Sequence, residues 1–180
     1  MEPTLVAPPG LKGLVVADTE VGAVRGQEGF FHYRQYDATE LAAAQPFEAI
    51  VHLLLDGAVP DASAAARFRS ELADRRRIGD DIAGLVDRLA EAGHPPLASL
   101  RALLSIAIDP RPSLDLTADE RRDAVLQAIG QTPTVLAAIH RRSLGLTPLA
   151  PDPALSHAAD YVRMVTGATP SDDHARAVER

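Results

Sequence analysis

The sequence predicts an all-α domain that is preceded by a small N-terminal β-hairpin. Two observations support this fold class. The stretches Asp37–Glu40 and Thr117–Glu120 have the spacing of a capping box. In this motif the side chains of the first and fourth residues accept hydrogen bonds from backbone N–H groups at the start of a helix. Helix-length apolar segments follow, bounded by Pro, Ser, Asp or Gly. We therefore expect an arm and hairpin over residues 1–36 and a helical domain over residues 37–180.

The hairpin is expected near the start because the strand-forming stretches lie there. Leu14–Ala17 is apolar, and Phe30–Tyr33 is rich in aromatic residues, which favour extended backbone. The segment between them, Asp18–Gly29, contains three glycines and is expected to form the turn. Three prolines within residues 1–10 predict an irregular arm.

Helices are expected to follow one another from Asp37 onward. Their starts are predicted from capping residues or proline, and their ends from glycine or proline. After a first helix opened by Asp37, the segments predicted as helices are 46–56, 62–77, 80–91, 97–108, 117–129, 133–144, 155–165 and 171–180.

Two of these segments carry expectations about packing and helix boundaries. Segment 97–108 is apolar on nearly every face, so we expect it to be central and buried. Pro133 is expected to open a new helix, because proline is favoured in the first turn of a helix.

Composition excludes several classes of function. With 180 residues, of which 46% are hydrophobic, the chain can form one domain with an aliphatic core. A net charge of −7 argues against a nucleic-acid or anionic-membrane surface. The absence of Cys excludes disulfides and thiolate metal sites. No apolar run reaches the roughly 18 residues of a membrane span. We expect a cytoplasmic protein that binds neither nucleic acid nor membranes.

The histidines do not predict a metal site. No two of them form a helical i, i+4 pair beside a carboxylate, which is the spacing that zinc sites on helices use. His52 lies in an apolar helix and is interpreted as a hydrogen-bonded core residue. His94 precedes two prolines and is expected to cap or brace a helix junction. The six histidines are His32, His52, His94, His140, His157 and His174.

Two groups of arginines are candidates for anion binding. Arg75–Arg77 could contact phosphate, but acidic neighbours favour a solvated helix end. Arg141 and Arg142 are expected to meet the negative end of a helix dipole. No glycine-rich phosphate loop follows a strand, and no Gly-x-Ser-x-Gly motif occurs. From the residues alone we assign no catalytic residue, no metal ligand and no known cofactor-binding residue.

Several stretches nevertheless occur in the order and spacing of one enzyme family. They are GLKGLV at 10–15, HLLLDGAVP at 52–60, GHPPLASLRALLS at 93–105 and the run from Gln131 to Gly167. With these stretches the chain resembles the citrate synthase family, including bacterial citrate synthases and 2-methylcitrate synthases. The resemblance implies a hairpin that leads into the N-terminal half of a helical large domain, which dimerises through its helices.

The resemblance also implies where the chemistry of the family lies. Family members are considerably longer. They bind oxaloacetate with a His-x-Asp-His-x-x-Asn segment, stabilise an enol with a Gly-Pro-Leu-His-Gly-Gly loop, and place a Gly-His-Arg segment ahead of Asp-Pro-Arg and an Asp base. Here Asp109–Arg111 is an Asp-Pro-Arg without the preceding Gly-His-Arg, and the other motifs do not occur. Pro9 stands where the family has an early coenzyme A-binding Arg.

Two hypotheses follow. In the first, the chain is the N-terminal part of an acyltransferase that condenses acetyl-CoA, or a longer acyl-CoA, with oxaloacetate and needs a C-terminal half for catalysis. Acetyl-CoA is then a substrate of the complete enzyme, and no cofactor is bound tightly. In the second, the chain is a non-catalytic interaction or regulatory subunit. In both we expect a homodimer or a pairing with a C-terminal half, because segment 97–108 needs neighbours on every side.

Overall fold

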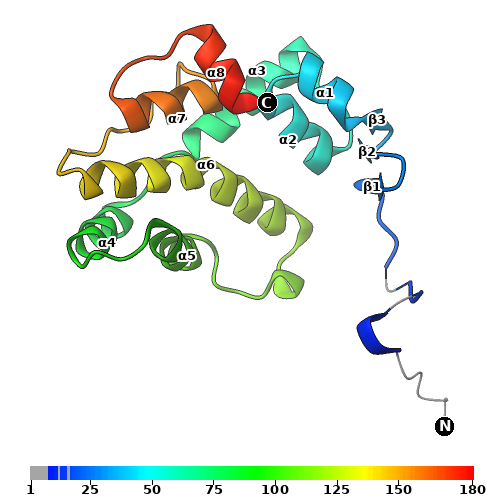
Figure 1. Cartoon of the computed structure of the whole chain (residues 1–180), viewed down its shortest axis with the longest axis horizontal. Helices are drawn as coiled ribbons and strands as arrows, with labels where there is room; N and C mark the ends of the chain where they lie inside the picture. Colours follow the sequence, from blue (N-terminus) through cyan, green and yellow to red (C-terminus); the bar gives the residue numbers. More distant parts are fainter. Residues whose placement is uncertain (1–7, 12, 16) are drawn as a thin grey trace.

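A three-stranded antiparallel sheet precedes eight α-helices in the part of the chain that the computed structural model describes, residues 8–11, 13–15 and 17–180 (Figure 1). The predicted fold class is confirmed. The strands are β1 (Gly22–Arg25), β2 (Phe30–Tyr33) and β3 (Tyr36–Asp37). The helices are α1 (Ala38–Ala44), α2 (Phe47–Asp56), α3 (Ala62–Asp74), α4 (Asp80–Glu91), α5 (Pro96–Ala107), α6 (Ala118–Ser143), α7 (His157–Thr166) and α8 (Asp172–Glu179).

The hairpin is made by β1 and β2, which pair antiparallel with Arg25 opposite Phe30. The predicted strand Phe30–Tyr33 is confirmed. The predicted partner, Leu14–Ala17, is wrong: residues 14, 15 and 17 are not in a strand, and residue 16 lies outside the described residues.

The partner strand lies inside the glycine-rich segment that the sequence predicts as the turn. Residues 26–29 alone form the turn, and Gly29 has the positive φ of 64° that such a turn requires. A short turn costs less loop-closure entropy than the longer one of the prediction. At Gly22 the two strands approach so closely that an added Cβ would collide with the carbonyl oxygen of His32.

Arg34 fixes the hairpin to the helices. Its backbone is in the left-handed region, with a φ of 50°, and its side chain reaches α2. There Nε donates to the carbonyl oxygen of Leu53 at 2.9 Å and Nη2 to that of Leu54 at 3.0 Å. A guanidinium at this place also meets the negative end of the α2 dipole.

Several helices start at the predicted capping residues. Asp37 accepts hydrogen bonds from the N–H groups of Thr39 and Glu40 and so caps α1. Thr117 and Glu120 form the reciprocal capping box at the start of α6. Ser171 caps α8.

Helix α6 is the central element of the molecule. Figure 1 shows it crossing the middle, with α4 and α5 on one side and α7 and α8 on the other. The prediction that Pro133 opens a separate helix is wrong, because α6 runs through Pro133 without ending. The proline ring is buried, and the hydroxyl of Thr132 donates to the carbonyl of Ala128 at 2.6 Å. Packing on several sides of α6 keeps the chain helical despite the missing N–H.

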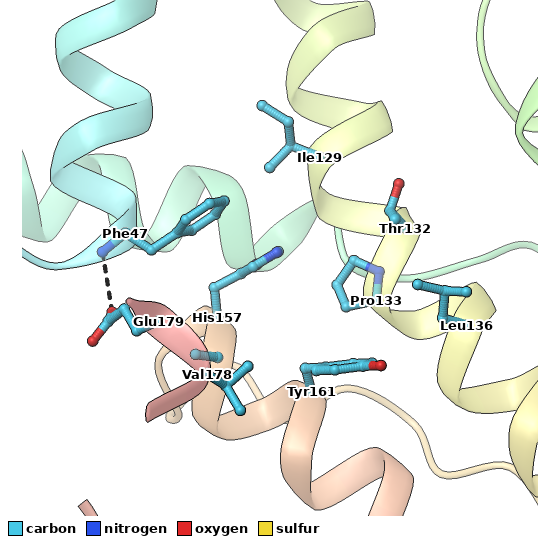
Figure 2. A pocket seen from close by; sticks show the side chains of 10 residues that line it. Phe47, Ile129, Thr132, Pro133, Leu136, His157, Tyr161, Val178 and Glu179 are labelled. Carbon is cyan, nitrogen blue, oxygen red and sulfur yellow. Dashed lines mark hydrogen bonds between the residues drawn. The ribbon is translucent and has the colours of Figure 1, made fainter. Parts of the chain in front are cut away.

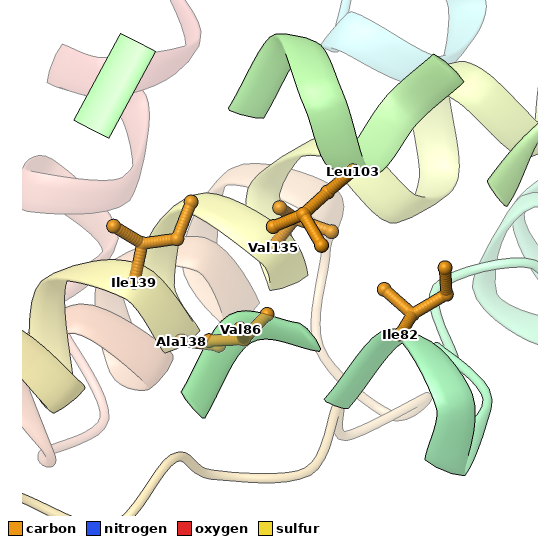
Figure 3. Packing of buried hydrophobic residues seen from close by; sticks show 6 residues of the cluster. All are labelled: Ile82, Val86, Leu103, Val135, Ala138 and Ile139. Carbon is orange, nitrogen blue, oxygen red and sulfur yellow. The ribbon is translucent and has the colours of Figure 1, made fainter. Parts of the chain in front are cut away.

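The larger hydrophobic cluster joins α4, α5 and α6 (Figure 3). It comprises Ile82, Val86, Leu103, Val135, Ala138 and Ile139. A second cluster joins α2, α3 and α6 through Val51, Phe68, Leu72 and Leu126. Both clusters contain side chains of α6, so this helix supplies the core that the two groups of helices share.

The expectation that segment 97–108 is central and buried is wrong for most of the helix. Leu103 of α5 is fully buried, but Leu97 and Ile106 are 73% and 57% exposed. An apolar sequence alone does not say which side of a helix has neighbours, and here α5 packs against α4 and α6 by one face. Among the described residues, no helix combines the length and apolar character needed to cross a bilayer.

Candidate functional site

A buried group of charges lies where α2, the end of α3 and α7 meet. Arg76 is fully buried, and its Nη1 lies 3.3 Å from Oδ2 of Asp160, while its Nη2 lies 3.8 Å from Oε1 of Glu48. The carboxylates of Glu48 and Asp160 are also almost completely buried. We call these three residues the Arg76 cluster.

The backbone brings Arg76 into the interior. The chain turns inward after α3, and the carbonyl of Arg76 accepts a 2.8 Å hydrogen bond from the hydroxyl of Thr134 on α6. Gly130, also on α6, allows this approach: an added Cβ there would lie 2.8 Å from the carbonyl oxygen of Arg75. The absence of a side chain at position 130 therefore sets how closely the chain after α3 crosses α6.

Both carboxylates of the cluster also accept hydrogen bonds from backbone N–H groups, in α7 and in the segment that precedes it. Oε1 of Glu48 accepts from the N–H of His157 at 2.8 Å, at the first turn of α7. Asp160 accepts from the N–H of Asp152 at 3.1 Å and from Nη2 of Arg163 at 2.7 Å. The cluster thus links segments that are far apart in the sequence.

The interpretation of Arg75–Arg77 as a solvated helix end is wrong for Arg76. Arg75 instead pairs with Asp123 of α6 at 2.5 Å, and Arg77 is exposed. No local sequence pattern marks Arg76, because its partners Glu48 and Asp160 lie outside its own helix and loop. Three consecutive arginines at a helix end look alike until the tertiary fold separates them.

An apolar hollow of about 420 Å³ opens next to the Arg76 cluster (Figure 2). Four helices line it, and we call it the apolar groove. Its lining residues are Phe47 of α2; Ile129, Thr132, Pro133 and Leu136 of α6; His157, Ala158 and Tyr161 of α7; and Val178 and Glu179 of α8.

His157 separates the groove from the charges. Its ring stacks on that of Phe47, with 5.0 Å between centroids and 15° between planes. Burial, and after it the nearby positive charge of Arg76, lower the pKa of His157 to about 4, while Glu48 and Asp160 act in the opposite direction. The imidazole is therefore neutral near pH 7. The groove presents mainly apolar surface, with an uncharged ring and the Glu179 carboxylate in its lining, which suits binding of apolar groups.

The other histidines considered as functional residues do not gather at one site. His52 is hydrogen-bonded as predicted, with Nδ1 2.9 Å from the carbonyl oxygen of Ala58, and its ring meets the edge of Phe68. The side chain of His94 is exposed, and only its backbone N–H helps to close α4. Among the residues that the structure describes, no three His, Asp or Glu side chains are grouped to hold a metal ion.

Arg141 and Arg142 also find partners beyond their own helix end. Arg142 pairs with Asp87 of α4 at 2.5 Å, and Arg141 donates to the carbonyl of Thr147 at 2.7 Å. Asp109 and Arg111 pair with each other in an exposed loop that also reaches Glu120. Neither group lies at the apolar groove.

Comparison with solved structures defines the class of fold. Citrate synthase from Pyrobaculum aerophilum superposes with a TM-score of 0.85 over 99% of this chain and 50% of its own, at 22% identity. A Thermoplasma acidophilum citrate synthase, solved as a ternary complex with carboxymethyl coenzyme A and oxaloacetate, superposes with a TM-score of 0.82 at 18% identity. The helices therefore form half of a citrate synthase fold.

Sequence comparison places the chain in a family. The family model for "Citrate synthase, C-terminal domain" matches residues 10–180. Citrate synthase of Deinococcus radiodurans is 31% identical over 93% of this chain and 44% of its own length. A 2-methylcitrate synthase of Mycobacterium tuberculosis is 30% identical over 95% of this chain and 43% of its own. The chain belongs to the citrate synthase family, and it spans less than half the length of these relatives.

Proposed function

We propose that this chain is the N-terminal part of a citrate synthase-type acyltransferase that is active only together with a C-terminal half. The observation that supports the proposal is the match to 44% of the length of a citrate synthase, combined with the absence from these 180 residues of the family's His-x-Asp-His-x-x-Asn and Gly-Pro-Leu-His-Gly-Gly segments.

The proposed reaction condenses acetyl-CoA with oxaloacetate. A carboxylate removes a proton from the acetyl methyl group, and the resulting carbon nucleophile attacks the ketone carbon of oxaloacetate. Water then hydrolyses the thioester and releases citrate and coenzyme A. Every side chain in these steps is supplied by the C-terminal half, and this chain supplies the helical scaffold. A longer acyl-CoA would lead to a methylcitrate-type product.

The test is a reconstitution assay of thiol release. The chain contains no Cys, so free thiol reports only coenzyme A. The chain alone is expected to release none from acetyl-CoA and oxaloacetate. Addition of the C-terminal half of the Deinococcus radiodurans relative, beginning after its matched segment, is expected to give activity. Release by the chain alone would contradict the proposal.

The second candidate is a non-catalytic interaction or regulatory subunit. The observation that favours it is the apolar groove, which offers a mainly apolar docking surface. In the same assay this candidate predicts no activity with the C-terminal half. It also predicts a changed rate when the chain is added to the full-length relative.

We also propose a homodimer that forms through α5. Leu97 and Ile106, both more than half exposed, lie at opposite edges of the solvent-facing side of this helix, with Ala98, Arg101, Ala102 and Ser105 exposed between them. Exposed large apolar side chains of this kind become buried when a partner covers the helix. The predicted self-association is thus attributed to the solvent-facing side of α5 and not to burial of the helix on every side.

A further inference from the structure

The apolar groove has the shape and chemistry of a binding site for a helix. Its floor is α6, where Ile129 and Leu136 lie about two turns apart on one face, and its walls are α7 and α8. Val125, one turn before Ile129, is 37% exposed and extends the same apolar stripe. The groove therefore presents a line of aliphatic side chains along α6 rather than a closed chamber for a small molecule.

The polar groups at the groove do not favour an anionic occupant. Glu179 already accepts a 3.0 Å hydrogen bond from the N–H of Phe47, and Thr132 donates to Ala128. His157 is uncharged near pH 7. A partner that fills this groove gains by burying apolar surface, and an anionic group placed there would lose hydration and face the Glu179 carboxylate.

The length of the relatives indicates which partner this is. The Pyrobaculum structure matches 99% of this chain but only 50% of its own, so the other half of that fold has no counterpart in these residues. The last described helix, α8, forms one wall of the groove, and its Val178 is 52% exposed there. The surface left open thus adjoins the point at which the matched half ends.

We propose that the apolar groove is the docking site for an apolar helix face of the C-terminal half of the citrate synthase fold. This inference rests on the proposed function, because it takes its partner from there. It adds the contact surface: the occupant lies along Ile129 and Leu136 of α6 and covers Val178 of α8. It places no anionic group in the groove.

Thiol labelling tests the inference, because the chain has no Cys of its own. The variants are Val178→Cys, at the groove, and Val24→Cys, on the hairpin, where the native side chain is 77% exposed. The probe is the separately produced C-terminal half of the Deinococcus radiodurans relative. Labelling at position 178 is expected to slow at least tenfold when the probe is added, and labelling at position 24 is expected to stay unchanged.

A second pair of variants guards against an effect of the thiol itself. Val178→Asp is expected to weaken binding of the C-terminal half at least tenfold in calorimetry, whereas Val24→Asp is expected to bind like the parent chain. Unchanged labelling at position 178, or no binding of the probe, would overturn the inference. So would labelling that slows with the concentration of the chain alone, since a second copy would then fill the groove.

The two proposals fail separately. If the halves bind through the groove but form no citrate, the docking inference stands and the proposed function is wrong. If the halves form citrate while position 178 stays fully accessible, the proposed function stands and the docking inference is wrong.

Discussion

Arg76 holds together parts of the chain that are distant in sequence, because its guanidinium faces Glu48 of α2 and Asp160 of α7 inside the protein. Removing one partner of a buried ion pair leaves the other charges without compensation. The residue therefore matters more to stability than the exposed Arg77 that follows it.

We expect Arg76→Met to lower the free energy of unfolding by about 3–5 kcal/mol, measured by urea denaturation at pH 7. Arg77→Met, at an exposed neighbouring position, is the control and should change it by less than about 0.5 kcal/mol. Adding Glu48→Gln and Asp160→Asn to Arg76→Met should recover part of the loss. Equal effects of the two single substitutions would show that the cluster does not stabilise the fold.

His157 gives stability a pH dependence. In the unfolded chain its pKa is near 6.5, and burial lowers the pKa to about 4 in the folded chain, so the unfolded state binds a proton first as the pH falls. The contribution of His157 is fully present above about pH 6.5 and is lost progressively towards pH 4. Between pH 7 and pH 5 this loss is about 2 kcal/mol.

Urea denaturation at the two pH values checks this expectation. His157→Phe should lose about 2 kcal/mol less than the parent chain between pH 7 and pH 5. His174→Gln, at an exposed position of α8, is the control and should keep the parental dependence. A parental pH dependence in His157→Phe would contradict the assigned role.

At the residue scale, the sequence predicted what local chemistry determines. Asp37, Thr117 and Ser171 cap their helices because each side chain acts on N–H groups two or three residues ahead. Arg76 could not be predicted in this way, since its role depends on residues in two distant helices. The groove could not be predicted from the sequence for the same reason, because the four helices that line it meet only in the folded chain.

At the scale of helices, α6 makes most of the packing contacts. Gly130 shows how closely the chain after α3 packs against this helix. Alanine has the higher helix propensity, by about 1 kcal/mol. An added Cβ at position 130, however, would lie 2.8 Å from the carbonyl oxygen of Arg75, where the backbone itself must move. The steric cost therefore exceeds the gain in propensity.

We expect Gly130→Ala to destabilise the fold by about 1–3 kcal/mol in urea denaturation. The matched control is Gly84→Ala in α4, where the nearest atom to an added Cβ is a side-chain nitrogen of Arg88 at 4.0 Å. That substitution should stabilise the chain by about 0.5–1 kcal/mol. If both variants changed the free energy of unfolding in the same direction, the contact between Gly130 and the backbone of Arg75 would be looser than described.

The errors of prediction at this scale have a common physical origin. Pro133 stays inside α6, and α5 exposes Leu97 and Ile106, because neighbouring helices decide both outcomes. The hairpin partner was misplaced because strand propensity favours Leu14–Ala17, whereas the short turn at 26–29 favours β1. Helix existence was predictable from local patterns, and the side on which each helix packs was not.

For the whole molecule, the exposed face of α5 predicts the oligomeric state. We expect light scattering to give twice the 19.1 kDa of one chain, and Leu97→Glu with Ile106→Glu to give a single-chain mass. Leu114→Glu, at a 91% exposed position outside α5, is the control and should leave the dimer intact. A parent chain that sediments at 19.1 kDa would contradict the dimer.

The hydrogen bond between Glu179 and Phe47 also sets an order of events during synthesis. It joins residues 132 positions apart, and the bond from His157 to Glu48 spans 109. At about 5–20 residues per second, a ribosome that has made the start of α2 needs roughly 7–26 s more to produce Glu179. Throughout that interval the first turn of α2 lacks the carboxylate that α8 provides. The nascent chain therefore completes this junction late, when α7 and α8 emerge from the exit tunnel.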